Sequence, residues 1–208
     1  LLSASLATTL WRLSHGRFAL GVGRGVAIRA QMMGLPPVKN RQLREFASLM
    51  RTLWKGERVF GHDSPLGKFP YLHQADWMNE PIPLLFTAFG QQSLEFAGTV
   101  FDGVILHTFM SDEAVRRAVS LVRRGAEKAG RDPQSVKVWS VLAVACNASE
   151  ERRLKLLTAR MATYLQAPAY GELLFAINGW DPQGLADFRN HDAVKAIPGA
   201  IDSIATTE

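Results

Sequence analysis

The stretch Leu20-Gly21-Val22-Gly23-Arg24-Gly25 is a short apolar run that ends in two glycines on either side of one arginine. It follows a helix-like segment over residues 1–17. A strand that ends in glycine exposes backbone N–H groups, and the guanidinium fork of Arg24 matches a pair of phosphate oxygens. The turn Gly23-Arg24-Gly25 is therefore a candidate anion cradle. The alternative is a tight strand-exit turn in which the arginine is only solvated.

The rest of the chain alternates short apolar runs with amphipathic segments. Buried strands are predicted at 18–22, 84–89, 104–109 and 137–146, and helices at 40–54, 93–100, 111–130 and 149–165. Strands that are joined through helices lie parallel in one sheet, because the crossover returns the chain to the same edge in the same direction. In such folds ligands bind at the carboxyl ends of the strands. The pattern thus directs attention to the residues that follow each apolar run.

Four strand–helix units fit either a doubly wound sheet or a (β/α)₈ barrel. A barrel usually needs ~250 residues, and this chain has 208. The first residue is Leu1, and the chain opens inside an amphipathic pattern that has no helix cap. We therefore expect an excerpt of a longer polypeptide, with the tail over residues 179–208 leading through a loop and a short helix into a final unit.

Residues 60–80 are rich in Gly, Pro and His and show no regular period. They predict a long insertion loop, which is either functional or a surface excursion. The histidines His62 and His73 share this segment with Asp63 and Asp76, a combination that could bind a metal. Their spacing is not that of a regular metal site, so we expect no bound metal.

The composition is that of an ordinary globular protein, with 47% hydrophobic and 21% charged residues and a net charge of +5. The basic surplus is spread along the chain, which favours an anionic small molecule over nucleic acid. A single cysteine, Cys146, indicates a reducing cytoplasm. No apolar run reaches the ~20 residues that a membrane crossing needs. We expect a cytoplasmic protein that does not contact membranes.

Residues 13–25 resemble the helix-to-strand signature of the bacterial luciferase-like flavin monooxygenases, a superfamily that includes many deazaflavin-dependent oxidoreductases. The segments 53–57, 83–90, 97–103 and 129–133 resemble later landmarks of that family, in the same order. The resemblance covers residues 1 to about 165. It implies an α/β fold, a partial TIM (β/α)₈ barrel with about four central βα units, the first and last units being missing. It also implies a single barrel domain over residues 1–208.

The resemblance further implies an enzyme that binds coenzyme F-420 (a deazaflavin) or FMN and transfers hydride, or performs flavin-dependent oxygenation, on a small-molecule substrate. In the family pattern an arginine after the fourth strand contacts the coenzyme phosphate, and Arg24 occupies that place. Backbone N–H groups after the fifth strand supply a second contact. The expected cofactor-binding residues are Gly23, Arg24, Gly25, Thr87, Ala88, Phe89 and Gly90.

Two positions depart from the family pattern. Phe89 stands where a serine often contacts the phosphate, which weakens the case for FMN. Some deazaflavin dehydrogenases carry a threonine and a glutamate around the fourth-strand turn, where this chain has Arg24 and Val26. This difference argues against a sugar-phosphate dehydrogenase.

His107 is the one candidate for a catalytic residue, because it ends a predicted strand where an imidazole could approach the coenzyme or the substrate. A hydrogen-bonded core histidine is the alternative. Family members often form homodimers, so we expect a homodimer. The alternative function is a catalytically inactive, barrel-derived binding or interaction protein, suggested by the absence of a clear acid–base pair.

Overall fold

The computed structural model describes residues 1–25, 30, 32–75 and 79–197. These residues form two compact units. The first contains residues 1–106 and 118–139, and the second contains residues 107–117 together with the described residues from 140 onward. The prediction of a single barrel domain over residues 1–208 stays a prediction.

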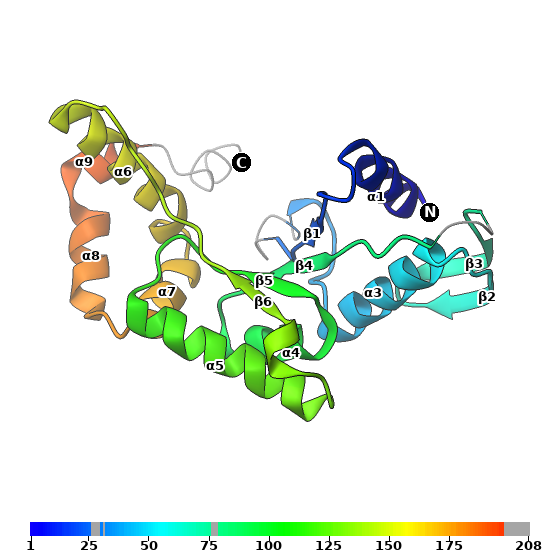
Figure 1. The fold of residues 1–208 in the computed structure, drawn as a ribbon. Coiled ribbons are helices and arrows are strands. Elements are labelled where there is room, and N and C mark those ends of the chain that lie inside the picture. The colour runs from blue at the N-terminus through cyan, green and yellow to red at the C-terminus, as the bar shows by residue number, and fades with distance from the viewer. Residues whose placement is uncertain (26–29, 31, 76–78, 198–208) are drawn as a thin grey trace. The chain divides into compact units, whose positions relative to one another are not determined.

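A four-stranded parallel sheet forms the centre of the first unit (Figure 1). Its strands are β1 (Leu20–Val22), β4 (Leu84–Thr87), β5 (Gly103–Ile105) and β6 (Lys137–Trp139), in the order β1-β4-β5-β6. Val22 pairs with Phe86, and Thr87 pairs with Ile105. The prediction of an α/β fold with four parallel strands is confirmed. The described strands form an open sheet, which is part of a barrel and not a closed one.

The helices of this unit follow the predicted segments closely. They are α1 (Leu2–Leu13), α3 (Asn40–Trp54), α4 (Gln91–Val100) and α5 (Asp112–Lys128), the last of which begins in the second unit. A short 3₁₀ helix (Pro133–Ser135) precedes β6. The bounds of α3 match the predicted helix because its apolar side chains recur at helical spacing and are buried on one face.

Aromatic packing joins β4 to α4. Phe86 stacks on Phe101 with ring centroids 4.9 Å apart, and Phe96 meets Phe86 edge-on at 6.1 Å. The helices α4 and α5 also approach each other closely. A Cβ atom added at Gly98 would overlap with the backbone oxygen of Val122, so glycine is required at this crossing.

Residues 59–72 form an antiparallel hairpin of β2 (Val59–Ser64) and β3 (Gly67–Leu72). The prediction of a long irregular loop over 60–80 is therefore wrong for this part, and residues 76–78 lie outside the described residues. Cross-strand ring contacts stabilise the hairpin, with the Phe60 and Tyr71 centroids 5.2 Å apart. Gly61 and Pro70 interrupt the alternation that would have identified the two strands.

The candidate metal ligands of this segment are separated by the hairpin. His62 Nε2 lies 2.9 Å from Ser64 Oγ and 3.3 Å from Glu45 Oε1. Asp63 points its carboxylate at Lys68 Nζ, 2.8 Å away. Within the described ranges no three His, Cys, Asp or Glu side chains gather as metal ligands would. Asp76 lies outside those ranges.

The second unit is helical. Its elements are α6 (Glu150–Leu165), α7 (Tyr170–Asn178), α8 (Pro182–Asn190) and α9 (Asp192–Lys195). The tail therefore contains more helix than the predicted loop and short helix. The fourth predicted strand is shorter than expected, since β6 ends at Trp139, and Leu142 and Val144 are 78% and 72% exposed. Among the described helices, none is both long and apolar enough to cross a membrane.

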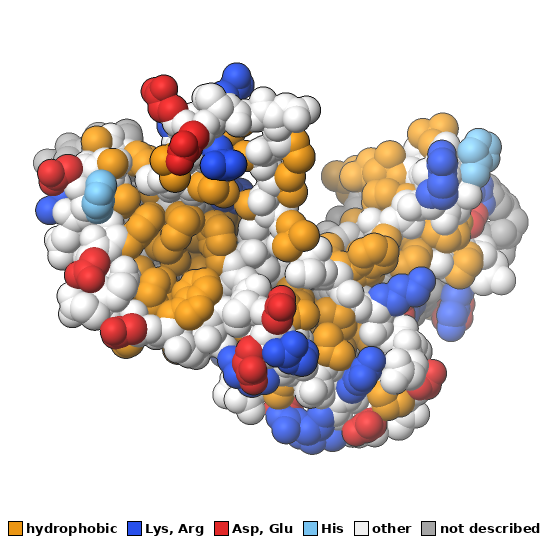
Figure 2. Space-filling model, turned by 60° about the vertical axis from the view of Figure 1, so that its left-hand side comes forward, with side chains coloured by type: hydrophobic (Ala, Val, Ile, Leu, Met, Phe, Trp, Pro, Cys, Tyr) orange, Lys and Arg blue, Asp and Glu red, His pale blue; other side chains and the backbone are white. Residues whose placement is uncertain are grey.

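Charged side chains of both signs are interspersed over the face shown in Figure 2. On α4 and α5, Glu95 accepts from Arg124 and from Lys128, the latter at 3.0 Å. These two cations lower the pKa of the Glu95 carboxyl to about 2. The basic residues of α5 thus belong in part to ion pairs on the surface of the first unit.

Candidate functional site

The turn after β1 and the segment after β4 lie next to each other at the carboxyl ends of paired strands. Because Val22 pairs with Phe86, the segment Gly23–Gly25 leaves β1 beside the segment Thr87–Gly90 that leaves β4. The Thr87 hydroxyl donates to the Val22 carbonyl oxygen at 3.2 Å. A Cβ atom at Gly23 would overlap with Thr87 Oγ1. The first glycine therefore allows the two turns to approach closely.

The second glycine has a different role. Gly25 has a φ of +69°, a left-handed conformation that other residues adopt at a cost. A Cβ at this position would meet no described atom within 4 Å. Gly25 is thus favoured by the backbone conformation and not by crowding.

Arg24 is half-buried and lies between β4 and the first residue of α3. Its Nη2 donates to Asn40 Oδ1, and its guanidinium carbon is 5.7 Å from the centroid of the Phe86 ring. Among the described residues no carboxylate pairs with Arg24, and its Nε is buried without a hydrogen-bond partner. Burial lowers the pKa of the guanidinium. A neutral amide and an aromatic face leave its positive charge uncompensated.

The start of α4, which follows the segment that leaves β4, offers backbone donors. Gly90 is the N-cap of α4, and no side chain caps the N–H groups of the first turn. That first turn also holds no acidic residue. A hollow of about 450 Å³ is lined by Gly90, Gln91, Gln92 and Ser93. The N-terminus of a helix carries unpaired N–H groups and a partial positive charge, so this hollow suits an anion.

Backbone hydrogen bonds within the predicted phosphate-binding segment Thr87–Gly90 determine which of its N–H groups can donate to a ligand. The Ala88 N–H donates to the Ile105 carbonyl oxygen at 3.1 Å, and Ala88 is only 4% exposed. That amide belongs to the sheet and is not available to a ligand. The available donors lie further along, at Gln91, Gln92 and Ser93. The sequence pattern did not identify them, because it predicted a helix that begins at Ser93 and the structure begins it at Gln91.

Asn40 is a site residue that sequence reasoning missed. It begins α3 and accepts the hydrogen bond of Arg24 across 16 residues of chain. The intervening segment includes Val26, which lies outside the described residues. Only its position at the start of a helix on the same edge could have pointed to it.

His107 belongs to the second unit, where aromatic rings surround it. The Tyr164 ring meets it edge-on at 4.6 Å, and Phe109 and Tyr170 lie at 5.5 and 5.7 Å. Its Nδ1 accepts from the Phe109 N–H at 3.1 Å, which places the ring proton on Nε2. Burial, and secondarily the charge of Arg160, lowers the pKa of His107 to about 4. The imidazole is thus neutral at pH 7.

Tyr170 is the second titratable group of this aromatic cluster. Burial, together with the nearby Tyr164, raises the pKa of its phenol to about 12. Arg160 lies over the Tyr164 ring with its guanidinium carbon 4.9 Å from the centroid. The cluster therefore presents neutral hydrogen-bonding rings and one cation, a set that can bind a polar, planar molecule.

Known proteins resemble this chain over most of its length. The family model for luciferase-like monooxygenases matches residues 1–197. An F-420-dependent glucose-6-phosphate dehydrogenase of Segniliparus rotundus is 36% identical over 135 residues, which are 62% of this chain and 40% of that protein. A 5,10-methylenetetrahydromethanopterin reductase of Methanolobus tindarius is 29% identical over 190 residues, 89% of this chain and 56% of that protein. The chain thus spans about half the length, or less, of these curated relatives.

Solved structures share the fold. The coenzyme F-420-dependent tetrahydromethanopterin reductase of Methanopyrus kandleri has a TM-score of 0.68 at 19% identity, over 95% of this chain and 62% of that one. An F-420-dependent secondary alcohol dehydrogenase, solved with an F-420–acetone adduct, has a TM-score of 0.62 at 18% identity, over 94% of this chain and 61% of that one. With the parallel sheet and the family match, these findings establish that the chain belongs to the luciferase-like monooxygenase family.

Proposed function

We propose that this chain belongs to an oxidoreductase that uses coenzyme F-420, with FMN as the alternative coenzyme, and that it contains the residues that bind the coenzyme phosphate. The family match and the F-420 dependence of the relatives named above support the proposal. The observation that carries it is the pairing of β1 with β4, which brings the turn that holds an uncompensated arginine beside the segment that leads into an uncapped helix N-terminus.

The residues present fit the phosphate of such a coenzyme. Arg24 supplies a charge that no described carboxylate neutralises, and its buried Nε has no hydrogen-bond partner among the described residues. The N-terminal amides of α4 supply a second side of the cradle. Gly23 lets the Thr87 hydroxyl close the gap between the two turns. A phosphate held from both sides would anchor one end of the coenzyme against the rim.

When bound, the coenzyme would supply the ring that accepts or donates a hydride. The chain's own residues would bind and orient it. We assign Arg24 and the amides of Gln91, Gln92 and Ser93 to the phosphate. His107 is our candidate for contact with the substrate, as a neutral imidazole whose proton is on Nε2. A small-molecule substrate, a homodimer and a cytoplasmic location stay predictions that size measurement and fractionation can check.

The proposal is tested by titrating coenzyme F-420 and FMN separately into the full polypeptide and into the variant Arg24→Ala. Charge-assisted contacts to phosphate are strong, so we expect the affinity for the preferred coenzyme to fall about ten-fold or more. The variant Arg17→Ala is the matched control, because Arg17 is exposed shortly before β1 and its side chain donates, among the described residues, only to the Ser14 carbonyl. Equal affinity of the wild type and Arg24→Ala would remove the role assigned to Arg24.

The inactive binding protein is separated from the enzyme by turnover. Reduced coenzyme F-420 that is bound with an affinity dependent on Arg24, but never oxidised with any acceptor, would favour the binding protein. Consumption of the reduced coenzyme in the presence of a small-molecule acceptor would favour the oxidoreductase. The two outcomes share the same phosphate cradle and differ only in the chemistry at the ring.

A further inference from the structure

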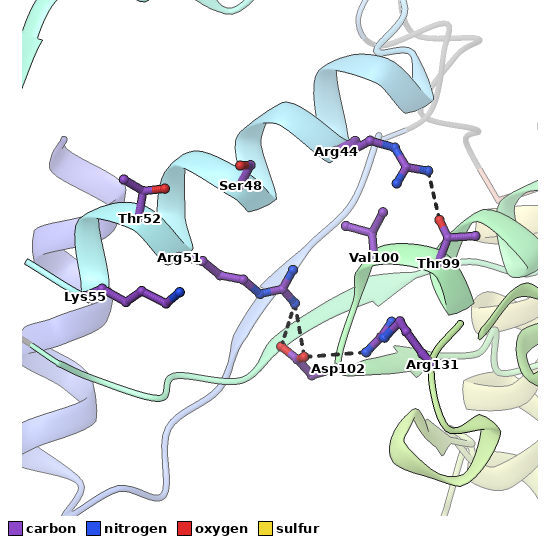
Figure 3. A pocket seen from close by; sticks show the side chains of 9 residues that line it. All are labelled: Arg44, Ser48, Arg51, Thr52, Lys55, Thr99, Val100, Asp102 and Arg131. Carbon is purple, nitrogen blue, oxygen red and sulfur yellow. Dashed lines mark hydrogen bonds and ion pairs between the residues drawn. The ribbon is translucent and has the colours of Figure 1, made fainter. Parts of the chain in front are cut away.

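A cationic pocket lies where the strands begin, whereas Arg24 follows the end of β1. Figure 3 shows the side chains that line the pocket. Asp102, directly before β5, lines it, and its backbone N–H donates to the carbonyl of Leu84, the first residue of β4. The pocket has a volume of about 430 Å³, within the size range of small-molecule sites. Nothing in the proposed coenzyme function uses this pocket.

The lining of the pocket is biased toward groups that bind anions. Arg44, Arg51, Lys55 and Arg131 are cationic, and Asp102 is the only acid among the nine lining residues. Three of the others carry hydroxyl groups, on Ser48, Thr52 and Thr99. The local charge is therefore three positive units in excess, in a hollow whose other polar side chains can all donate hydrogen bonds.

One face of α3 supplies most of the positive charge. Arg44, Ser48, Arg51 and Lys55 follow at spacings of four, three and four residues, which places them in one row along the helix. Figure 3 shows these side chains extending from α3 on the side of the pocket. Like charges four residues apart, as at Arg51 and Lys55, repel each other in an isolated helix. A bound anion would offset that repulsion.

Asp102 neutralises only part of this charge, and it holds the two inner arginines in place. Both of its carboxylate oxygens accept from Arg51 Nη2 at 3.0 Å, and Arg131 Nη2 lies 3.9 Å away. Oδ2 also accepts from the Leu84 N–H at 2.9 Å. Arg131 is fixed further by donating to the carbonyls of Gly98 and Phe101. The inner half of the pocket is thus preorganised.

The two outer cations have no such compensation. Arg44 donates to Thr99 Oγ1 at 3.0 Å and lies over the Phe96 ring, 5.5 Å from its centroid. Within the part of the chain that the structure describes, no carboxylate pairs with Arg44 or with Lys55. Both side chains are on exposed positions of the pocket wall. They can therefore turn toward a ligand at little structural cost.

We propose that this pocket binds a small phosphorylated anion, a phosphate monoester or a diphosphate, with Arg44 and Lys55 as its charged ligands and Arg51 and Arg131 as a fixed positive floor. An oxyanion with two or more negative charges matches the excess charge, and its oxygens match the hydroxyl donors on the wall. Because the pocket is at the amino ends of the strands, its ligand does not compete with a coenzyme at the carboxyl edge.

The test is calorimetric titration of the full polypeptide with inorganic pyrophosphate and, separately, with adenosine monophosphate, at two salt concentrations. We expect saturable binding that weakens with salt. Tighter binding of pyrophosphate indicates a diphosphate ligand, and tighter binding of the nucleotide indicates a phosphate monoester. Lys55→Gln and Arg44→Gln should each weaken binding about ten-fold or more, with melting temperatures close to that of the wild type.

Two controls make the result specific. Arg41→Gln removes the same charge from an exposed position of α3 that does not line the pocket, and it should leave the affinity within about two-fold. Arg24→Ala should also leave it unchanged, which separates this site from the coenzyme edge. The absence of saturable binding overturns the proposal. So does an equal loss in Arg41→Gln or Arg24→Ala, or a loss of coenzyme F-420 affinity in Lys55→Gln.

Discussion

Gly23 and Thr87 occupy neighbouring strand ends so closely that a side chain at the glycine would overlap with the threonine hydroxyl, which instead donates to Val22. This contact couples the turn that carries Arg24 to the segment that leads into α4. The backbone of Gly23 does not have a positive φ, so its need for glycine comes from the neighbour and not from its own conformation.

We expect Gly23→Ala to destabilise the protein by about 1–3 kcal/mol and to weaken coenzyme binding, because it pushes Thr87 away from β1. Removing the hydroxyl relieves the overlap, since Thr87 Cβ lies 3.7 Å from the added atom. The double variant Gly23→Ala/Thr87→Ala should therefore recover most of the lost stability in urea unfolding. Additive losses in the two single variants and the double variant would contradict this coupling.

Gln92→Glu should weaken coenzyme binding by about five-fold or more without destabilising α4. A carboxylate in the first turn is favourable to the helix but repels a phosphate at the same N-terminus. Thermal unfolding and coenzyme titration measure the two effects separately. Gln134→Glu, which changes the charge equally on the 3₁₀ helix before β6, is the control and should leave coenzyme affinity unchanged.

Stability should fall between about pH 6.5 and pH 4 in a way that depends on His107. Its pKa in the folded protein is about 4, below the ordinary value of 6.5, so the unfolded chain binds the extra proton first as the pH falls. The contribution of His107 to the free energy of unfolding is therefore complete above pH 6.5 and is lost toward pH 4. It amounts to about 1–2 kcal/mol once the partial exposure of the ring is considered.

Urea midpoints at pH 7, 5.5 and 4.5 measure this dependence. His107→Asn keeps an acceptor for the Phe109 N–H and removes the titrating ring. The difference in stability between the wild type and this variant should shrink as the pH falls from 7 to 4.5. A difference that stays constant with pH would show that His107 does not titrate in the folded state as we expect.

Gly98→Ala should destabilise the first unit by about 3 kcal/mol or more. The added methyl group would overlap with the Val122 carbonyl and lie 2.8 Å from the Ala126 nitrogen, and both are backbone atoms that cannot rotate away. Gly184→Ala is a suitable control in another helix, where the nearest described atom is 3.5 Å away. Replacing that glycine should leave the stability unchanged or raise it slightly.

The sequence by itself determined the elements whose signals are local. The bounds of α3 follow from helical spacing, Gly90 marks the end of a strand segment, and Gly130 marks a helix end. The parallel direction of the strands follows from their helical connections. The hairpin over 59–72 was missed because Gly61 and Pro70 interrupt the alternation of apolar and polar residues that marks a strand. Its two strands are defined by their pairing with each other. The early end of β6 was missed because a strand's length depends on a neighbour to pair with.

The residues of the candidate site were predicted from position, but their bonding was decided by the tertiary structure. The sequence placed Arg24 and the segment Thr87–Gly90 at strand ends. Only the fold directs Arg24 to Asn40 and commits the Ala88 N–H to Ile105. Helical and strand periods are properties of neighbouring residues, whereas hydrogen-bond partners are set by the packing of segments far apart in the chain, which the local pattern does not contain.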